Sequence, residues 1–445
     1  MKRIRIIAVL LAWTGIFQAI AQDSITSVSL SQACRLGIDH NLMIANTALE
    51  MHKAHYQVKE TQSKLYPQLE GYSTLNYYFG IPKMLMPGEI FGQTGEIPFE
   101  IGTKYDWSSG FSASLSLYNQ SYFTSIKVAK CMQTVSRLNL QQKKEELAYQ
   151  VSQVYYLCKT TDSQIAYLKK DMTNASHLLE ILKSQNENGM VRKIDYSKVL
   201  VNKNNLQTQI ENLILLRDQQ LGMLKFLIGI NENSKVELTD SLTYSNNSGT
   251  IELPDLNNLS ELKLMDEQIE ITTLSRKANQ QSYIPTLSGT GQLYYQGQQN
   301  EFNFFKGGSD KFFKVGFVGI TLNVPIFDGF GKQAKNKQYE IELQQLQNTR
   351  RNSLTGYSKN FSEAVQQYTN SHNALLRQKE NIKIAEEDYS ISLQGYKQQV
   401  VPLSDVMLSE NSLTEACLSY VNAMLQLKNA ELEVRKSKGE LLNNL

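Results

Sequence analysis

Residues 66–71, with the sequence YPQLEG, return loosely as residues 284–289, with the sequence IPTLSG. Two further echoes follow in the same order. Residues 117–120 (LYNQ) return as 326–329 (IFDG), and residues 191–195 (VRKID) return as 401–405 (VPLSD). All three pairs are separated by about 210 residues, and self-similarity at one offset is typical of a repeated structural unit. The sequence therefore predicts a chain made of two copies of one unit.

Apolar residues recur every three or four positions through most of both copies, which is the seam of helices packed side by side. The other helix faces carry Lys, Gln, Glu and Asn, so such helices need partners in a bundle. This pattern predicts a first repeat at 22–232 with helices 30–65, 120–188 and 191–229, a linker at 233–257, and a second repeat at 258–445 with helices 258–283, 332–398 and 403–444.

The helix lengths suggest how each repeat is arranged. Within a repeat, the two shorter helices together are about as long as the long one, so they can stack end to end beside it. The turns near Gly189 and Pro402 would then lie at one end of the helices. The segments 68–119 and 285–325, which we expect to be β-hairpins, would lie at the other end.

The hairpin segments show alternation with a period of two, which indicates strands that face two environments. In the first, Ser108, Gly110, Ser112, Ser114 and Ser116 alternate with a mostly apolar set, which consists of Ser109, Phe111, Ala113, Leu115 and Leu117. A solvated sandwich strand would also alternate. Tyrosines near the strand ends and predicted export favour a membrane β-barrel with a wet lumen instead. Four strands cannot close a barrel, so the chain would have to oligomerise.

The first residues predict export. Lys2, Arg3 and Arg5 precede a mostly apolar stretch, and the small-x-small sequence 19–21 resembles a cleavage site, so we expect a signal peptide at 1–21. The alternative is a membrane anchor, but the apolar stretch is shorter than a spanning helix requires. Removing these three basic residues turns the formal charge of +2 slightly negative, which gives no reason to expect a nucleic-acid partner.

No catalytic constellation stands out, and we expect no enzyme activity, no cofactor and no metal site. His52 and His55 are spaced i, i+3 on a predicted helix, but an exposed helical face explains them better than a metal site. The Gly-Gly-Ser sequence at 307–309 is expected to be a loop tip, because no helix follows it. The four cysteines show no CxxC pairing and are interpreted as packing residues, although disulfides remain possible.

In its arrangement of helices and hairpins, the chain resembles the TolC-like outer-membrane efflux protein family over almost its whole length. The resemblance rests on the duplicated order of helix, hairpin and long helix. It also rests on short stretches at the strand ends and helical turns, namely 66–67 (YP), 284–285 (IP), 324–329 (VPIFDG), 189–195 (GMVRKID) and 402–407 (PLSDVM). The first copy departs from the pattern because it has no proline before Tyr118.

The resemblance implies a mostly α-helical homotrimer in the outer membrane, with a tunnel extending into the periplasm and one shared twelve-stranded β-barrel embedded in outer-membrane lipid. It implies a passive exit duct for efflux or type I secretion, coupled to an inner-membrane transporter through a periplasmic adaptor. An exported coiled-coil structural or adhesin-like protein would also show heptads, but it would not explain duplicated hairpins. A periplasmic enzyme would lack a candidate site.

Asp195 and Asp405 each lie in the first turn of a predicted helix, where the helix dipole favours an acid by about 0.3–1 kcal/mol. In a trimer, each would also form a ring of three carboxylates at the narrow end of the tunnel, which could select cations and set a gate. The resemblance supports Asp405 more than Asp195. Some relatives carry a second acid three residues later, where this chain has Leu408, so the cation filter would be weaker.

The helical turns are the expected contact surface for the adaptor. The second turn has Gln399 where the first has Gly189. Apolar side chains at a turn suggest a surface that a partner covers. The candidate contact residues are Gly189, Gln399, Val400, Val401 and Pro402.

Overall fold

The computed structural model describes residues 26–92, 94–187, 191–243, 252, 254–305 and 312–443. The expected signal peptide, Gly189 and the 307–309 tip lie outside these residues. The chain divides into two compact units. The first, here called the helical unit, contains residues 1–48, 139–263 and 352–445. The second, here called the sheet unit, contains residues 49–138 and 264–351.

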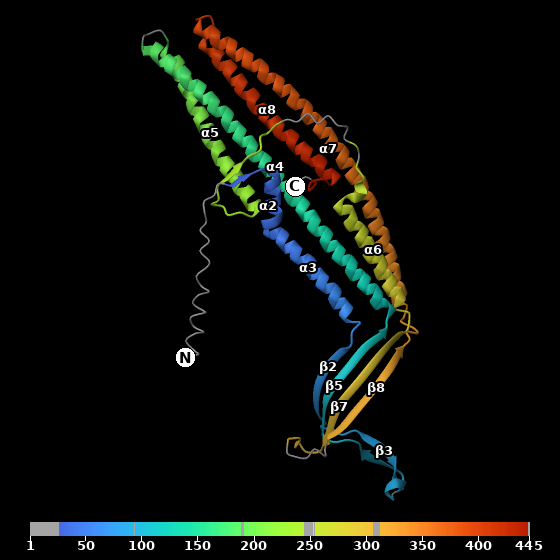
Figure 1. The fold of residues 1–445 in the computed structure, drawn as a ribbon. Coiled ribbons are helices and arrows are strands. Elements are labelled where there is room, and N and C mark those ends of the chain that lie inside the picture. Colours follow the sequence, from blue (N-terminus) through green and yellow to red (C-terminus); the bar gives the residue numbers. More distant parts are fainter. Residues whose placement is uncertain are drawn as a thin grey trace, which may run out of the picture. The chain divides into compact units, whose positions relative to one another are not determined.

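The helices repeat along the chain, as expected (Figure 1). The long helices α4 and α7 contain 68 and 67 residues, and α5 and α8 contain 36 residues each. The bounds are α2 Leu30–His40, α3 Leu42–Ser63, α4 Gln120–Glu187, α5 Lys193–Ile228, α6 Ser260–Gln281, α7 Gly331–Lys397 and α8 Leu403–Lys438. Left-handed glycines end α5 and α8 at corresponding places, Gly229 with φ 71° and Gly439 with φ 69°.

The expected helix 30–65 differs from the structure, where Asn41 divides it into α2 and α3. The backbone of Asn41 is extended, with ψ at 122°. Its side-chain oxygen accepts a hydrogen bond from the Met43 N–H at 2.8 Å, and its side-chain nitrogen donates to the Leu227 carbonyl at 2.9 Å. A side chain that bonds to the backbone in this way offers an alternative to the helix, which explains the break.

Buried apolar side chains hold the helical unit together in three clusters. One joins α2, the middle of α4, the end of α5 and the short parallel strands β1 (Thr26–Val28) and β6 (Val236–Leu238). A second packs the end of α4 against the start of α5, with Leu182, Val199 and Leu206 at its centre. The third joins α7 and α8 through Leu375, Met424 and Leu427. Most of the α4, α5, α7 and α8 side chains in these clusters lie on the three-four seams predicted from the sequence.

The sheet unit contains a four-stranded antiparallel sheet in the order β2-β5-β7-β8 (Figure 1). The strands are β2 Gln68–Tyr77, β5 Tyr105–Tyr118, β7 Thr286–Gln299 and β8 Phe312–Asn323. The register places Phe111, Leu293 and the residues in line with them on one face. That face is apolar yet exposed, and Val318 on it is 91% exposed. Ser108, Ser112, Ser114 and Ser116 of β5 lie on the opposite face, as the alternation predicted, whereas Ser109 lies on the same face as Phe111.

The segment 68–119 contains more than the single hairpin expected. Between β2 and β5, a second hairpin pairs β3 (Lys83–Pro87) with β4 (Glu96–Glu100) around the short helix η1 (Gly88–Phe91). Its strands have only five residues each, and a proline lies in each of them. Such short segments carry little periodic signal, and proline argues against a strand.

Aromatic rings gather at one end of the sheet. Trp107 of β5 lies with its ring centroid 5.4 Å from Phe304, 5.5 Å from Phe305 and 5.7 Å from Phe312. The indole N–H of Trp107 donates to the Ser73 hydroxyl at 2.9 Å. Offset and edge-on ring pairs of this kind stabilise a fold beyond the area they bury. The cluster therefore packs Phe304 and Phe305, which follow β7, against Trp107 of β5.

Within the described part of the chain, no helix combines the length and the apolar character needed to cross a membrane.

Candidate functional site

The turn between α7 and α8 is tightly built from backbone contacts. Gln399 adopts a left-handed conformation with φ 62°, and its N–H donates to the Tyr396 carbonyl at 2.9 Å. The Val400 N–H donates to the Gly395 carbonyl, also at 2.9 Å. Left-handed backbone costs a residue with a side chain roughly 1–2 kcal/mol, so glycine would be the easier choice at position 399. The turn keeps one defined shape in spite of this cost.

The same turn presents apolar side chains to solvent. Val400 is 77% exposed, whereas Val401 folds back so closely that a Cβ on Gly395 would lie 2.5 Å from its Cγ2 atom. Pro402 precedes α8 with φ −72° and ψ 155°, so it ends the turn and starts the helix. Only Gly189 of the expected contact residues falls outside the described chain.

Asp405 and Asp195 occupy corresponding helix starts but have different surroundings. The carboxylate of Asp195 accepts hydrogen bonds from Arg192, at 3.1 Å from Nε and 3.4 Å from a terminal nitrogen, and its side chain is 15% exposed. Asp405 is exposed and accepts a hydrogen bond from the Ser404 hydroxyl at 3.1 Å. No ion pair to Asp405 is found among the described residues. Its charge is therefore open to solvent, while Arg192 neutralises Asp195.

Asp405 and Leu408 border one groove between α7 and α8, with a volume of about 780 Å³. Leu408 is 68% exposed, and Ile384 and Ile391 of α7 line the same groove. The groove therefore combines acids with exposed apolar side chains. Asp195 does not take part in it.

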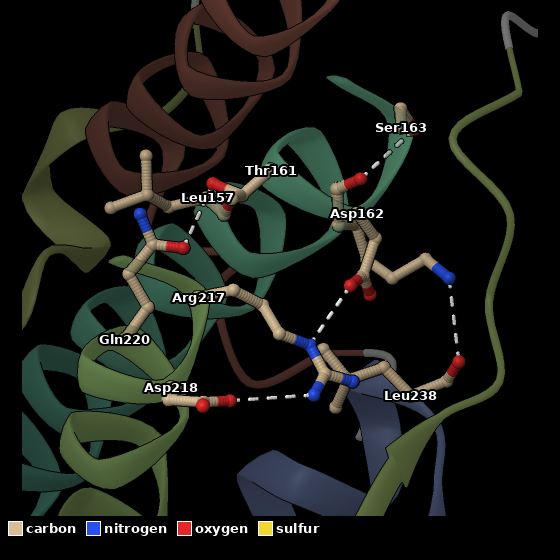
Figure 2. A network of polar contacts seen from close by, with 9 residues as sticks. Leu157, Thr161, Asp162, Ser163, Arg217, Asp218, Gln220 and Leu238 are labelled. Atoms are coloured by element: carbon tan, nitrogen blue, oxygen red, sulfur yellow. Dashed lines mark hydrogen bonds and ion pairs between the residues drawn. The ribbon is translucent and has the colours of Figure 1, made fainter. Parts of the chain in front are cut away.

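A polar network fastens α5 to α4 further along the helices, and Figure 2 shows its side chains. Arg217 of α5 pairs with Asp162 of α4 at 3.0 Å, and the Thr161 hydroxyl donates to Gln220 at 2.9 Å. The Lys159 ammonium donates to the Leu238 carbonyl at 3.3 Å, which also ties β6 to α4. Sequence analysis did not identify this network, because the partners are far apart in the chain.

Two acids are buried among the described residues of the helical unit, and sequence analysis missed both. Glu410 of α8 is 4% exposed and Asp171 of α4 is 8% exposed. Burial first, and the charge of Asp171 second, raise the pKa of Glu410 to about 7. The sequence did contain a signal, since Glu410 lies on the same three-four seam as the buried Val406 and Cys417.

The histidine and cysteine interpretations can be compared with the structure. His55 is exposed and lies 3.2 Å from the Gln133 side chain. Among the described residues no group of three or more His, Cys, Asp or Glu could hold a metal ion. All four cysteines are free thiols, and Cys34, Cys158 and Cys417 are buried, which agrees with a packing role.

Solved structures share this fold. The Campylobacter jejuni CmeC outer membrane channel has a TM-score of 0.74 at 16% identity, over 92% of this chain and 85% of that one. CusC has a TM-score of 0.73 at 14% identity, over 94% and 95%. The open state of the Neisseria gonorrhoeae MtrE outer membrane channel has a TM-score of 0.71 at 14% identity, over 92% and 88%. No curated protein sequence matches the chain.

The sequence itself matches the profile of a family described as outer membrane efflux protein, over residues 36–229 and 258–440. These two ranges correspond to the two repeats and leave out the segment between them. The match confirms the resemblance, the outer-membrane localisation and the efflux-channel function predicted from the sequence, and nothing supports the adhesin alternative. With both halves matched, this chain belongs to the outer membrane efflux protein family.

Proposed function

We propose that three copies of this chain form a passive exit duct, in which three four-stranded sheets close into one twelve-stranded barrel. The observation that carries the proposal is the sheet itself. Among the described strands, β2 and β8 each have a neighbour on one side only, and the apolar face is exposed. Unpaired strand edges need hydrogen-bond partners, which the sheets of neighbouring copies would supply. Exposed apolar faces are unfavourable in water, and lipid would surround them. The polar face, with Ser108, Ser112, Ser114 and Ser116 of β5, would line the lumen.

The turn between α7 and α8 is proposed as a docking surface for a periplasmic adaptor, which would connect the duct to an inner-membrane transporter. Support comes from Val400, an exposed apolar side chain on a turn with a defined backbone. We propose that Gly189, in the corresponding turn of the first repeat, contributes to the same surface. The duct would need no cofactor and carry out no chemistry.

One experiment tests both parts. A Val400→Cys variant, extracted in mild detergent, should have three times the mass of one chain, and in cells it should cross-link to an adaptor. Ile90→Cys is the matched control, because Ile90 is also an exposed apolar side chain but lies on η1. A stable monomer in detergent-free buffer would contradict the trimer. Cross-links from position 90 but not from position 400 would contradict the docking surface.

Asp405→Asn should reduce cation selectivity and weaken block by multivalent cations in planar-bilayer recordings. Three copies of this exposed carboxylate around the threefold axis would attract cations and repel one another. Asparagine removes the charge and keeps the shape, so trimer stability should change little.

Asp195→Asn is the control, because Arg192 already neutralises that carboxylate. It should leave selectivity nearly unchanged. If Asp405→Asn channels assemble and keep both their selectivity and their cation block, the carboxylate ring is refuted. The only role left to Asp405 is then to stabilise the start of α8 through the helix dipole.

A further inference from the structure

Glu410 lies where α8 packs against the rest of the helical unit. On α8 the buried side chains Leu403, Val406 and Cys417 lie on the same seam. An ionised carboxylate at such a position loses its hydration, and it needs a hydrogen-bonded or charged partner to compensate. The contacts around Glu410 therefore decide which protonation state it can hold.

Those contacts do not replace the hydration that the carboxylate of Glu410 loses on burial. Its Oε1 atom is buried and has no hydrogen-bond partner among the described residues. The neighbouring acid, Asp171 of α4, is better placed, because the Thr414 hydroxyl donates to it at 2.5 Å. Both acids border one cavity of about 260 Å³, which the α5 side chains Asn202 and Gln209 also line.

The charges that face the pair are mostly negative. The residues lining the cavity include no Lys, Arg or His, and α5 contributes only neutral side chains to it. From α4, Lys170 acts on Asp171 and lowers its pKa, against the larger effect of burial. The charges of both acids add to burial in raising the pKa of Tyr389 on α7 to about 12. On α8 itself, the exposed Glu415 lines the same cavity, and burial first and Asp171 second raise the pKa of the buried Cys417 thiol to about 11.

The protonation of Glu410 is consequently linked to packing. Burial and Asp171 raise its pKa to about 7, from 4.5 for the exposed group. Because the packed state holds the proton more tightly, its stability falls as the pH rises between these two values. Near neutral pH the packed α8 would therefore lose stability as the proton leaves.

We propose that Glu410 and Asp171 form a proton-linked joint between α8 and α4, which holds the start of α8 in place while Glu410 is protonated and loosens it when the proton is lost. Asp405 and Leu408 lie within two turns of Glu410 on the same helix. Loosening would therefore reach the groove between α7 and α8. That last step, a pH-dependent entrance, rests on the proposed duct, whereas the joint itself does not.

Hydrogen–deuterium exchange of the detergent-extracted protein tests the joint without requiring conduction. After correction for intrinsic rates, amides of 403–414 should exchange about tenfold faster at about pH 8 than at about pH 6. Glu410→Gln should remove this difference and stay protected at both values. Asp171→Asn should move the loss of protection to lower pH and reduce the difference between about pH 6 and about pH 8, because removing the neighbouring negative charge lowers the pKa of Glu410. Glu380→Gln, at an exposed position of α7 that does not line this cavity, is the control and should behave like the unmodified chain.

An exchange rate in 403–414 that does not depend on pH would overturn the joint, and so would a dependence that survives in Glu410→Gln. Protection restored at about pH 8 by added Mg²⁺ or Ca²⁺ alone would also overturn it, because the pair would then hold a metal ion instead of a proton. Bilayer currents of the same variants test the entrance separately. Unchanged currents together with pH-dependent exchange would refute the gating step and leave the joint standing.

Discussion

Replacing Gly110 by alanine should prevent the sheet from forming and remove the assembled protein from the outer membrane. Gly110 lies in β5, which pairs with strands on both sides. A Cβ built there would lie 2.3 Å from the Leu293 carbonyl oxygen and 2.3 Å from the Tyr294 Cβ. Real atoms do not approach so closely, and backbone on β7 cannot move aside without breaking the pairing of β5 with β7. We expect almost no folded protein in outer-membrane fractions.

Gly71→Ala provides the matched control in the same sheet. On the edge strand β2, a Cβ at position 71 would meet its nearest atom, on the Phe111 ring, at 3.6 Å, which is ordinary contact. Membrane fractionation followed by electrophoresis without heating should show normal assembly of Gly71→Ala and none of Gly110→Ala. Equal yields of the two variants would show that β5 and β7 are not paired as described.

Gly229→Ala should destabilise the helical unit far more than the corresponding change Gly439→Ala. Both glycines end a 36-residue helix with positive φ, so alanine pays the same backbone strain of roughly 1–2 kcal/mol at either site. At position 229 the new Cβ would also lie 2.7 Å from the backbone oxygen of His40, at the end of α2. At position 439 its nearest neighbour is the flexible end of Leu259, at 3.2 Å.

Because both variants carry the same backbone strain, the difference between them measures the contact of the new Cβ at position 229 with the His40 backbone. In denaturant titrations followed by circular dichroism, we expect Gly229→Ala to lose roughly 1–3 kcal/mol more than Gly439→Ala, which is the usual range for overpacking. Equal losses would mean that α2 does not abut the end of α5. The experiment therefore also tests the break at Asn41, whose side chain bonds to the neighbouring Leu227 carbonyl.

Features that depend on local periodicity were predictable from the sequence. The three-four seam predicted α4, α5 and α7 to within two residues of their ends, and alternation predicted the two faces of β5. The predicted helix 403–444 was six residues too long, because the left-handed Gly439 ends α8 after Lys438. Asn41 escaped notice because one polar residue does not interrupt a seam, and its bond to Leu227 joins residues far apart in the chain.

The candidate site was predictable only in part. Asp195 and Asp405 were found together through the repeat, but the sequence could not show that Arg192 neutralises only the first. Glu410 was overlooked because its burial beside Asp171 depends on how α8 packs against α4, which the sequence of α8 does not show. Partners brought together by folding cannot be read from spacing along the chain.

The ring cluster around Trp107 makes the sheet unit optically distinct. The chain contains two tryptophans, and Trp13 lies within the expected signal peptide. The ultraviolet emission of the processed protein would then come from one indole, held beside Phe304, Phe305 and Phe312. Its wavelength would follow the sheet, while far-ultraviolet ellipticity would follow mainly the helices. Two spectra from one sample would thus show whether the units fold together or in sequence.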